Sequence, residues 1–312
     1  MINRACYVIG FLLCFGCLPV AAQTPGAVSA ELLSESPTIK PGEPFWVSVR
    51  LQASEGLYVP WKNPGQQGHP PNVYWKLPEG FRAGSIEWPS PEKIECGGGA
   101  CFGYPEGADL LTLVIPPKLL ADGALADLAA SVEWSACRGS QCSSGFKELS
   151  LRLPVSRRSP ALSDLALNEA KRALPQPQVD MDVRAVQDEE RVYLYSAFKG
   201  DPENLHFFPW DEGLVDWGTG IRAQKWRGGA LLSIPKNKAA PFFPSRLRGV
   251  LKDPTPQADR VWKRGVWIDV RLEPKAGWSA FWDVPISGIP WIATALLCGC
   301  LAVLVFRRIM RG

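Results

Sequence analysis

Methionine, histidine and clustered basic charge are all scarce in this sequence. Its 312 residues include three Met and two His, the formal net charge is +3, and no run of Lys and Arg interrupts the body of the chain. Without such a run the chain lacks the electrostatic footprint of a nucleic-acid-binding protein, so we predict no nucleic-acid partner. It also lacks a phosphate-binding glycine loop, a nicotinamide fingerprint and a Ser-His-Asp motif, which argues against the enzyme classes that these motifs define.

Turn-forming residues and tryptophan, in contrast, are abundant. The chain contains 29 Gly, 29 Pro and 13 Trp, and 46% of its residues are hydrophobic. Many turns and few Met are typical of an all-β protein rather than a helical one. A chain of this length and hydrophobic content can bury two cores, and we therefore predict two domains.

Both ends of the sequence have the pattern of export signals. Residues 1–22 combine a charged start at Arg4, an apolar stretch and small residues up to Ala22, which is typical of a secretory signal peptide. Residues 286–306 are uncharged and long enough for a membrane-spanning helix across a hydrocarbon core of about 30 Å. Three Arg follow within residues 307–312, which predicts a cytoplasmic tail. We expect a single-pass inner-membrane protein with its bulk in the periplasm.

Alternating apolar residues predict strands in two regions. In the stretch EPFWVSVRLQ, residues 43–52, Phe or an aliphatic residue occupies every second position from Phe45 to Leu51, as expected for a strand with one buried face. Further strands are predicted at residues 109–116, 128–134 and 147–155, and then at 192–198, 229–235, 247–251 and 266–272. Short strands separated by Gly and Pro turns favour β-sandwiches.

The two β regions cover residues 23–155 and 179–280, with a linker at residues 156–178. In that linker, Ser163 or Asp164 can cap a short helix, which proline ends shortly after Arg172.

Four cysteines fall in the exported part of the chain. Of the nine in total, three lie in the predicted signal peptide and two in the predicted membrane helix, which leaves Cys96, Cys101, Cys137 and Cys142. An even number in an oxidising compartment indicates two disulfides, for which three connectivities are possible.

Cys137 and Cys142 flank the turn of a predicted hairpin in the stretch VEWSACRGSQC. The ends of such a turn lie opposite each other, at a Cα separation that a disulfide can bridge. Closing so short a loop removes only about 2 kcal/mol of unfolded-chain entropy, so the bond is a weak staple. Arg138 would favour the thiolate of Cys137. From spacing alone the pair is a structural staple, an exchanging disulfide, or half of a zinc site, although neither His69 nor His206 lies near a cysteine pair in sequence.

The segments GLYVPWKNPGQQGHPPNVYWKLPEGFRAGSIEWPSPEKI, FGYPEGADLLTLVIPP and VEWSACRGSQC together resemble the N-terminal periplasmic domain of the thiol:disulfide interchange protein DsbD, especially its ScsB-type relatives. The later segment HFFPWDEGLVDW resembles the second periplasmic domain of the ScsB-type architecture more loosely. The resemblance implies an all-β protein with two tandem immunoglobulin-like β-sandwich domains. It also implies thiol-disulfide exchange, without a cofactor, at Cys137 and Cys142, with Cys142 as the attacking thiol.

The resemblance further implies partners. Electrons would come from a membrane reductase and pass to oxidised periplasmic proteins of the thioredoxin fold. The family's multi-helix membrane domain and thioredoxin-like domain match no part of this sequence, so a separate reductase is expected. Two alternatives stay open: a non-catalytic binding or assembly protein with structural disulfides, and a protein that handles Cu or Zn, as the copper-tolerance association of ScsB-type relatives suggests.

Cys96 and Cys101 fall where the family carries a loop near the redox pair. Three glycines separate them, which makes a local disulfide easy to form, and we expect a secondary, structural or regulatory bond. By analogy with the family, Phe102 and Tyr104 are expected to shield the sulfurs of Cys137 and Cys142.

Overall fold

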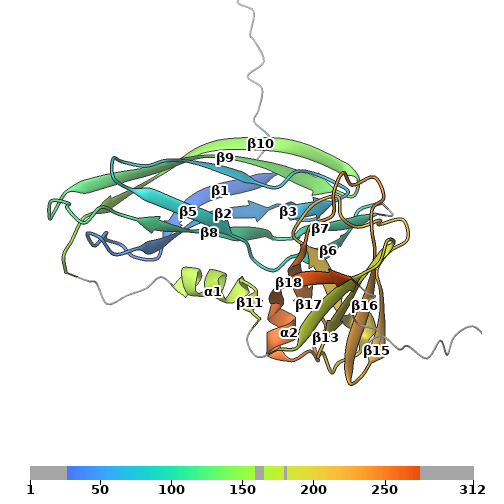
Figure 1. The fold of residues 1–312 in the computed structure, drawn as a ribbon. Coiled ribbons are helices and arrows are strands. Elements are labelled where there is room, and N and C mark those ends of the chain that lie inside the picture. Colours follow the sequence, from blue (N-terminus) through green and yellow to red (C-terminus); the bar gives the residue numbers. More distant parts are fainter. Residues whose placement is uncertain (1–26, 98, 159–164, 179–180, 275–312) are drawn as a thin grey trace, which may run out of the picture.

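The computed structural model describes residues 27–97, 99–158, 165–178 and 181–274, and within these it is built mainly of β-strands (Figure 1). The first domain contains β1 (Val28–Ser34), β2 (Phe45–Ala53), β3 (Val59–Gly65), β4 (Asn72–Lys76), β5 (Arg82–Glu87), β6 (Glu92–Glu95), β7 (Ala100–Tyr104), β8 (Gly107–Ile115), β9 (Leu125–Arg138) and β10 (Gln141–Pro154). The strands predicted in this region from alternation are all present. The all-β class is therefore confirmed.

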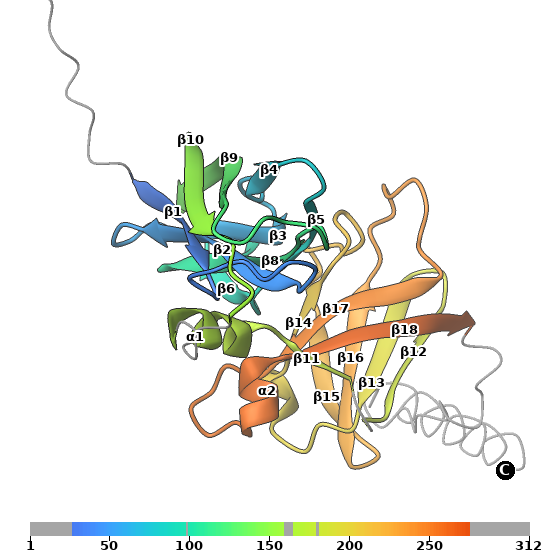
Figure 2. The same cartoon turned by 90° about the vertical axis from the view of Figure 1, so that its left-hand side faces the viewer.

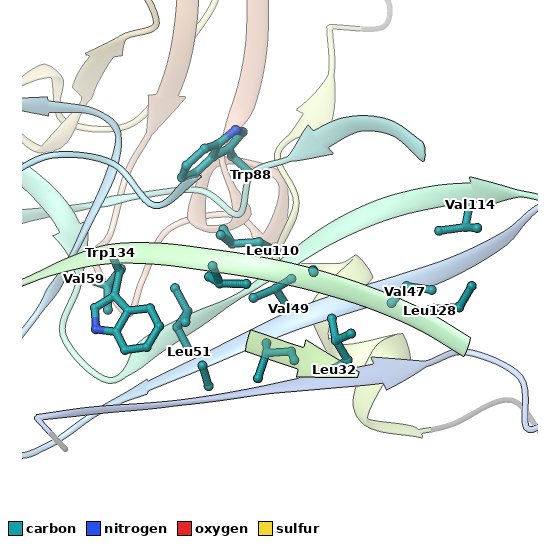
Figure 3. Packing of buried hydrophobic residues seen from close by; sticks show 14 of the residues in the cluster. Leu32, Val47, Val49, Leu51, Val59, Trp88, Leu110, Val114, Leu128 and Trp134 are labelled. Atoms are coloured by element: carbon teal, nitrogen blue, oxygen red, sulfur yellow. The ribbon is translucent and has the colours of Figure 1, made fainter. Parts of the chain in front are cut away.

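Three antiparallel sheets make up the first domain. Their strand orders are β1-β2-β8-β5, β10-β9-β4 and β3-β7-β6. The long β9–β10 hairpin arches over the sheet that contains β2 and β8 (Figure 1). Side chains from the two sheets meet between them, with Val49 of β2, Leu110 of β8 and Leu128 of β9 all fully buried (Figure 3). The period-two pattern of the sequence thus produces this core directly.

The second domain contains β12 (Val183–Gln187), β13 (Arg191–Ser196), a 3-10 turn (Pro202–Asn204), β14 (His206–Pro209), β15 (Arg222–Trp226), β16 (Gly229–Pro235), β17 (Arg246–Lys252), α2 (Arg260–Arg264) and β18 (Val266–Pro274). Its strands form one continuous sheet in the order β14-β17-β18-β12-β13-β16-β15, whereas the sequence pattern led us to expect two separate sheets. Because β18 pairs with β17 along its first part and with β12 near its end, the two halves of the sheet share one strand and one core.

The linker packs against both domains. Helix α1 (Leu165–Ala173) ends within one residue of its predicted end, while the expected caps Ser163 and Asp164 lie outside the described residues. Buried Leu167 of α1 contacts the first domain at Leu111, and the two-residue strand β11 (Gln176–Pro177) pairs with β18 of the second domain. Figure 2 shows α1 and α2 close to one another below the first domain.

The two domains are joined by an aromatic cluster that crosses their boundary. Trp61 of β3 is fully buried and makes edge-on contacts with Phe208 and Trp210, at ring-centroid distances of 6.3 and 5.9 Å. Buried Asn63 donates hydrogen bonds to the carbonyl oxygens of Pro209 (2.8 Å) and Asp211 (3.1 Å). Phe208 and Trp210 of the second domain therefore lie at the domain boundary, where they pack against β3 of the first domain.

The predicted signal peptide (residues 1–22) and membrane helix (residues 286–306) lie outside the described residues. Among the helices that the structure describes, none combines the length and the apolar character needed to cross a bilayer.

Candidate functional site

Cys137 and Cys142 are a directly opposed pair at the open turn of the β9–β10 hairpin. They are register partners across the two strands, their Cα atoms are 4.0 Å apart, and their sulfurs form a disulfide. The turn between them includes Gly139, which has a φ of +57°, a conformation that favours glycine. The hairpin predicted from the sequence is thus present, and it places the two cysteines opposite each other.

The two cysteines of this disulfide differ in exposure. Cys137 is fully buried, whereas Cys142 is exposed at the start of β10. Cys137 is also fixed by the backbone on its other side, because its N–H donates to Tyr58 O (3.0 Å) and its carbonyl oxygen accepts from Tyr58 N (2.9 Å). The bond therefore has an outer cysteine that a partner can approach and an inner one held within the sheet.

The segment that lies against the sulfurs is the turn after β3. Gly68 has a φ of +81°, and a Cβ built on it would lie 2.8 Å from Cys137 Sγ and 3.5 Å from Cys142 Sγ. The same Cβ would lie 2.7 Å from Cγ of Pro60. Only a residue without a side chain fits here, so the backbone at Gly68 covers the Cys137 side of the disulfide, while Cys142 is exposed.

Cys96 and Cys101 form the second disulfide, with a Cα separation of 6.1 Å. Cys96 and Cys101 are both buried, and together with Tyr58 and Cys137 they form a single cluster of buried side chains. The structure thus brings together the four cysteines of the described residues, which the sequence placed in two pairs about 40 residues apart: three lie in the buried cluster, and Cys142 is joined to it by its disulfide to Cys137.

The turn after β3 is hydrogen-bonded to the strand that carries Cys101. Gln66 N donates to Ala100 O at 3.0 Å, and Ala100 N donates to Gln66 Oε1 at 2.8 Å. The turn that lies against Cys137–Cys142 is therefore hydrogen-bonded to Ala100, the residue that precedes Cys101 of the second disulfide.

The shielding role expected for Phe102 and Tyr104 does not agree with their positions. In β7 they point to the opposite side from Cys101, because successive side chains of a strand alternate between faces. Phe102 packs against Phe208 and Trp217 at centroid distances of 5.1 and 5.2 Å. Tyr104 is buried, its hydroxyl donates to Pro89 O at 2.8 Å, and burial raises its pKa well above the usual value. The cover of the disulfide comes from Gly68 instead.

Tyr58 is the most notable polar group beside the cysteines. Its hydroxyl is buried and finds no hydrogen-bond partner among the described residues, and burial raises its pKa. The Arg138 guanidinium, expected to favour the thiolate of Cys137, donates instead to the carbonyl oxygens of Glu55 (3.0 Å) and Gly56 (3.3 Å). The unpartnered polar group of the buried cluster that contains Cys137 is therefore the Tyr58 phenol.

Sequence reasoning missed Tyr58, Pro60 and Gly68 as parts of this site. The Gly and Pro residues of the stretch NPGQQGHPP are typical of a turn, but nothing in the sequence indicated that this turn lies on a disulfide. In the part of the chain that the structure describes, no three His, Cys, Asp or Glu side chains are grouped as metal ligands, and all four cysteines there are paired.

Comparison with known proteins agrees with this geometry. Residues 29–154 match the sequence model of the family described as "Thiol:disulfide interchange protein DsbD, N-terminal". This part of the chain is a DsbD N-terminal-like domain. The resemblance seen in its sequence motifs is confirmed, and the family match indicates a periplasmic thiol-disulfide exchange protein.

One solved structure extends the likeness in fold to the second domain. The crystal structure of the N-terminal periplasmic domain of ScsB from Proteus mirabilis has a TM-score of 0.56 at 15% sequence identity, covering 78% of this chain and 94% of that chain. That share exceeds residues 29–154, so the shared fold continues beyond the DsbD N-terminal-like domain. A protein of unknown function from Porphyromonas gingivalis W83 has a TM-score of 0.23 at 15% identity, covering 80% and 100% of the two chains. A search of curated proteins finds no match.

Proposed function

We propose that this protein is a membrane-anchored periplasmic thiol-disulfide exchange protein whose working bond is Cys137–Cys142. It receives reducing equivalents from a separate membrane reductase and passes them to oxidised periplasmic proteins of the thioredoxin fold. The observation that supports this most strongly is the unequal exposure of the two cysteines, with Cys142 exposed and Cys137 buried, in a DsbD N-terminal-like domain.

The unequal exposure gives each cysteine a step in the exchange. A donor thiolate attacks Cys142 Sγ, forms a mixed disulfide, and releases Cys137 as a thiolate. The second thiolate of the donor then attacks the sulfur of the donor's first cysteine in the mixed disulfide, which releases Cys142 as a thiolate. Two electrons and two protons have moved to the domain, and the donor dithiol has become a disulfide. In the opposite direction, the Cys142 thiolate attacks an oxidised acceptor and Cys137 resolves the mixed disulfide.

The surroundings of Cys137 suit a thiolate that exists briefly. The side chain of Tyr58 belongs to the same buried cluster, and its hydroxyl has no acceptor among the described residues while the disulfide is intact. A hydrogen bond from a neutral donor to a charged acceptor is stronger than one between neutral groups. We therefore propose that the Tyr58 hydroxyl donates a hydrogen bond to the Cys137 thiolate when the disulfide opens.

Trapping of mixed disulfides tests the exchange. Cys137→Ala leaves the exposed Cys142 without its resolving partner, so it should accumulate mixed disulfides with thioredoxin-fold proteins in the periplasm. Cys142→Ala is the matched control, since it leaves only a buried thiol, and it should capture less. If neither variant captures a partner, the exchange reaction is refuted.

The reduction potential of Cys137–Cys142 separates exchange from the purely structural alternative. Inert structural disulfides lie below about −300 mV, whereas exchanging disulfides lie nearer −200 mV. Equilibration of the full-length chain with glutathione buffers, followed by alkylation and peptide mapping, measures this value. A value below −300 mV would favour a non-catalytic binding or assembly protein.

Handling of Cu or Zn would require both disulfides to be opened first, because a thiolate is the form that binds these metals. Metal analysis of reduced, anaerobically prepared protein tests that alternative.

A further inference from the structure

We infer that Cys96–Cys101 is a second redox site, which receives and returns electrons through Cys137. The inference rests on the exchange function proposed for Cys137–Cys142 and gives that bond a partner within its own domain. The domain would then hold up to four electrons, two on each cysteine pair.

Burial closes the second disulfide to direct attack by another protein. Cys101 is fully buried and Cys96 is 3% exposed, whereas Cys142 is exposed. A protein thiol must reach a sulfur atom to attack it, so a folded partner has access to the outer pair and not to the inner one. The buried cluster that contains Cys96 and Cys101 includes one cysteine of the outer pair, Cys137.

Contacts between the backbones keep the two pairs together. Two backbone hydrogen bonds join Tyr58 to Cys137. Strand β3 begins at the residue after Tyr58 and pairs with β7. In that pairing, Gly65 of β3 lies opposite Cys101 of β7. The two cysteine-closed loops also meet, because a Cβ built on Gly97 would lie 3.7 Å from Cβ of Ser140. Groups held this close react at a high effective concentration, as in other intramolecular reactions.

The alternative role of this disulfide, a staple, gives little stability. The loop that it closes is six residues long, and a loop of that size restricts the unfolded chain by only about 2 kcal/mol. The loop between Cys96 and Cys101 is already fixed at its ends by the β6–β7 pairing and by the hydrogen bonds between Gln66 and Ala100.

The transfer balances within the domain. After an external dithiol has reduced the outer pair, the Cys137 thiolate attacks one sulfur of Cys96–Cys101, forms a mixed disulfide, and releases the other sulfur as a thiolate that takes up a proton. The Cys142 thiolate then attacks Cys137 Sγ, which re-forms Cys137–Cys142 and releases the second inner thiolate. The inner pair is now a dithiol, and the outer pair is oxidised and ready for another donor.

A rearrangement test needs no external partner. In the full-length Cys142→Ser variant, Cys137 is a free thiol beside an intact Cys96–Cys101 bond. At mildly alkaline pH, alkylation and non-reducing peptide mapping should find a disulfide that joins Cys137 to Cys96 or Cys101. Cys137→Ser is the matched control and should keep Cys96–Cys101, since its remaining thiol is on the outside. Finding only Cys96–Cys101 in both variants, each with an intact cooperative unfolding transition, would overturn the inference.

A second measurement covers the case in which these variants fold poorly. Reduced thioredoxin, a protein dithiol, should reduce both pairs of the unaltered chain. When Cys137 and Cys142 are both replaced by Ser, it should reduce Cys96–Cys101 at least about tenfold more slowly, because the internal route is lost. Dithiothreitol, which is small, serves as the control for reducibility. Equal rates with thioredoxin would refute the internal route.

These outcomes separate the two proposals. If thioredoxin fails to reduce Cys137–Cys142 but Cys142→Ser rearranges, the exchange function fails and the internal transfer stands. If thioredoxin reduces Cys137–Cys142 and no rearrangement occurs, the exchange function stands alone.

Discussion

Replacement of Gly68 by alanine tests whether the turn after β3 covers the Cys137–Cys142 disulfide. The residue has a φ of +81°, and an added Cβ would lie 2.8 Å from Cys137 Sγ and 2.7 Å from Pro60 Cγ. Neither neighbour is the free end of a flexible side chain, since one atom belongs to a disulfide and the other to a proline ring. We expect the turn in Gly68→Ala to be displaced from the sulfurs.

The size of the effect follows from two separate costs. A left-handed backbone conformation costs an alanine about 1–2 kcal/mol relative to glycine. The new contacts are well inside the optimal separation of about 3.5–4.0 Å, and overpacking of this kind costs about 1–3 kcal/mol more. Gly123→Ala isolates the first cost, because Gly123 has a φ of +79° and no atom lies within 4 Å of its Cβ position. The difference in unfolding free energy between the two variants should therefore be about 1–3 kcal/mol.

Denaturant unfolding of the oxidised full-length chain measures this difference, and reduction kinetics measure its consequence for access. A penalty of about 1–3 kcal/mol on the closed turn raises the displaced population about 5–150-fold. Reduction of Cys137–Cys142 by a thioredoxin-fold dithiol should accelerate in Gly68→Ala by up to that factor, and not in Gly123→Ala. If the two variants match each other in both stability and reduction rate, the turn does not cover the disulfide.

Three further perturbations test the boundary between the domains, its pH dependence and the membrane anchor. Asn63→Ala removes the two hydrogen bonds that Asn63 donates across the boundary and the one that its side chain accepts from Gly65 N, so denaturant unfolding should show a loss of about 1–3 kcal/mol. Asn237→Ala, which removes an exposed side-chain hydrogen bond at a half-buried residue, should lose less. Burial, followed by the charge of Lys93, lowers the pKa of His206, so the folded state resists protonation of this side chain. The neutral His206 side chain contributes its full stabilisation above the unfolded-state pKa of about 6.5, and this contribution is lost as the pH falls below that pKa. Denaturant midpoints of unfolding measured at pH 7.5 and pH 5 should therefore differ less in His206→Gln than in the unaltered protein. Deletion of residues 286–312 should leave exchange in vitro unchanged and lower the reduced fraction of the outer cysteine pair in cells, where equal fractions at equal abundance would contradict a membrane-bound electron donor.

Local sequence patterns located eight of the 18 strands that the structure describes, namely β2, β8, β9, β10, β13, β16, β17 and β18. The β16 strand, Gly229–Pro235, coincides with its prediction, and β2, β8, β13 and β17 were located within a few residues. The cysteine hairpin was equally predictable, because a strand, a short turn with Gly139 and a second strand bring Cys137 opposite Cys142 through neighbouring residues alone. Such features depend on side-chain alternation and turn geometry, which a short stretch of sequence specifies.

The roles of Phe102 and Tyr104 could not be derived in the same way. Analogy placed them over the sulfurs, but which face of β7 meets the cysteines depends on how that strand pairs with β3. In the structure the side chain of Cys101 belongs to the buried cluster that contains Cys137, while Phe102 packs against Phe208 of the second domain. A strand pattern shows that two faces exist, but the neighbouring elements decide what each face contacts.

The sequence by itself determined the all-β class, the positions of eight strands and the hairpin that places Cys137 opposite Cys142, because these depend on interactions between residues close along the chain. Only the tertiary structure decided that both disulfides meet in one buried cluster and that Gly68 lies against Cys137–Cys142. It also decided that β3 packs against the second domain. These contacts join residues that are far apart in the sequence and depend on the packing of whole sheets, which no local pattern records.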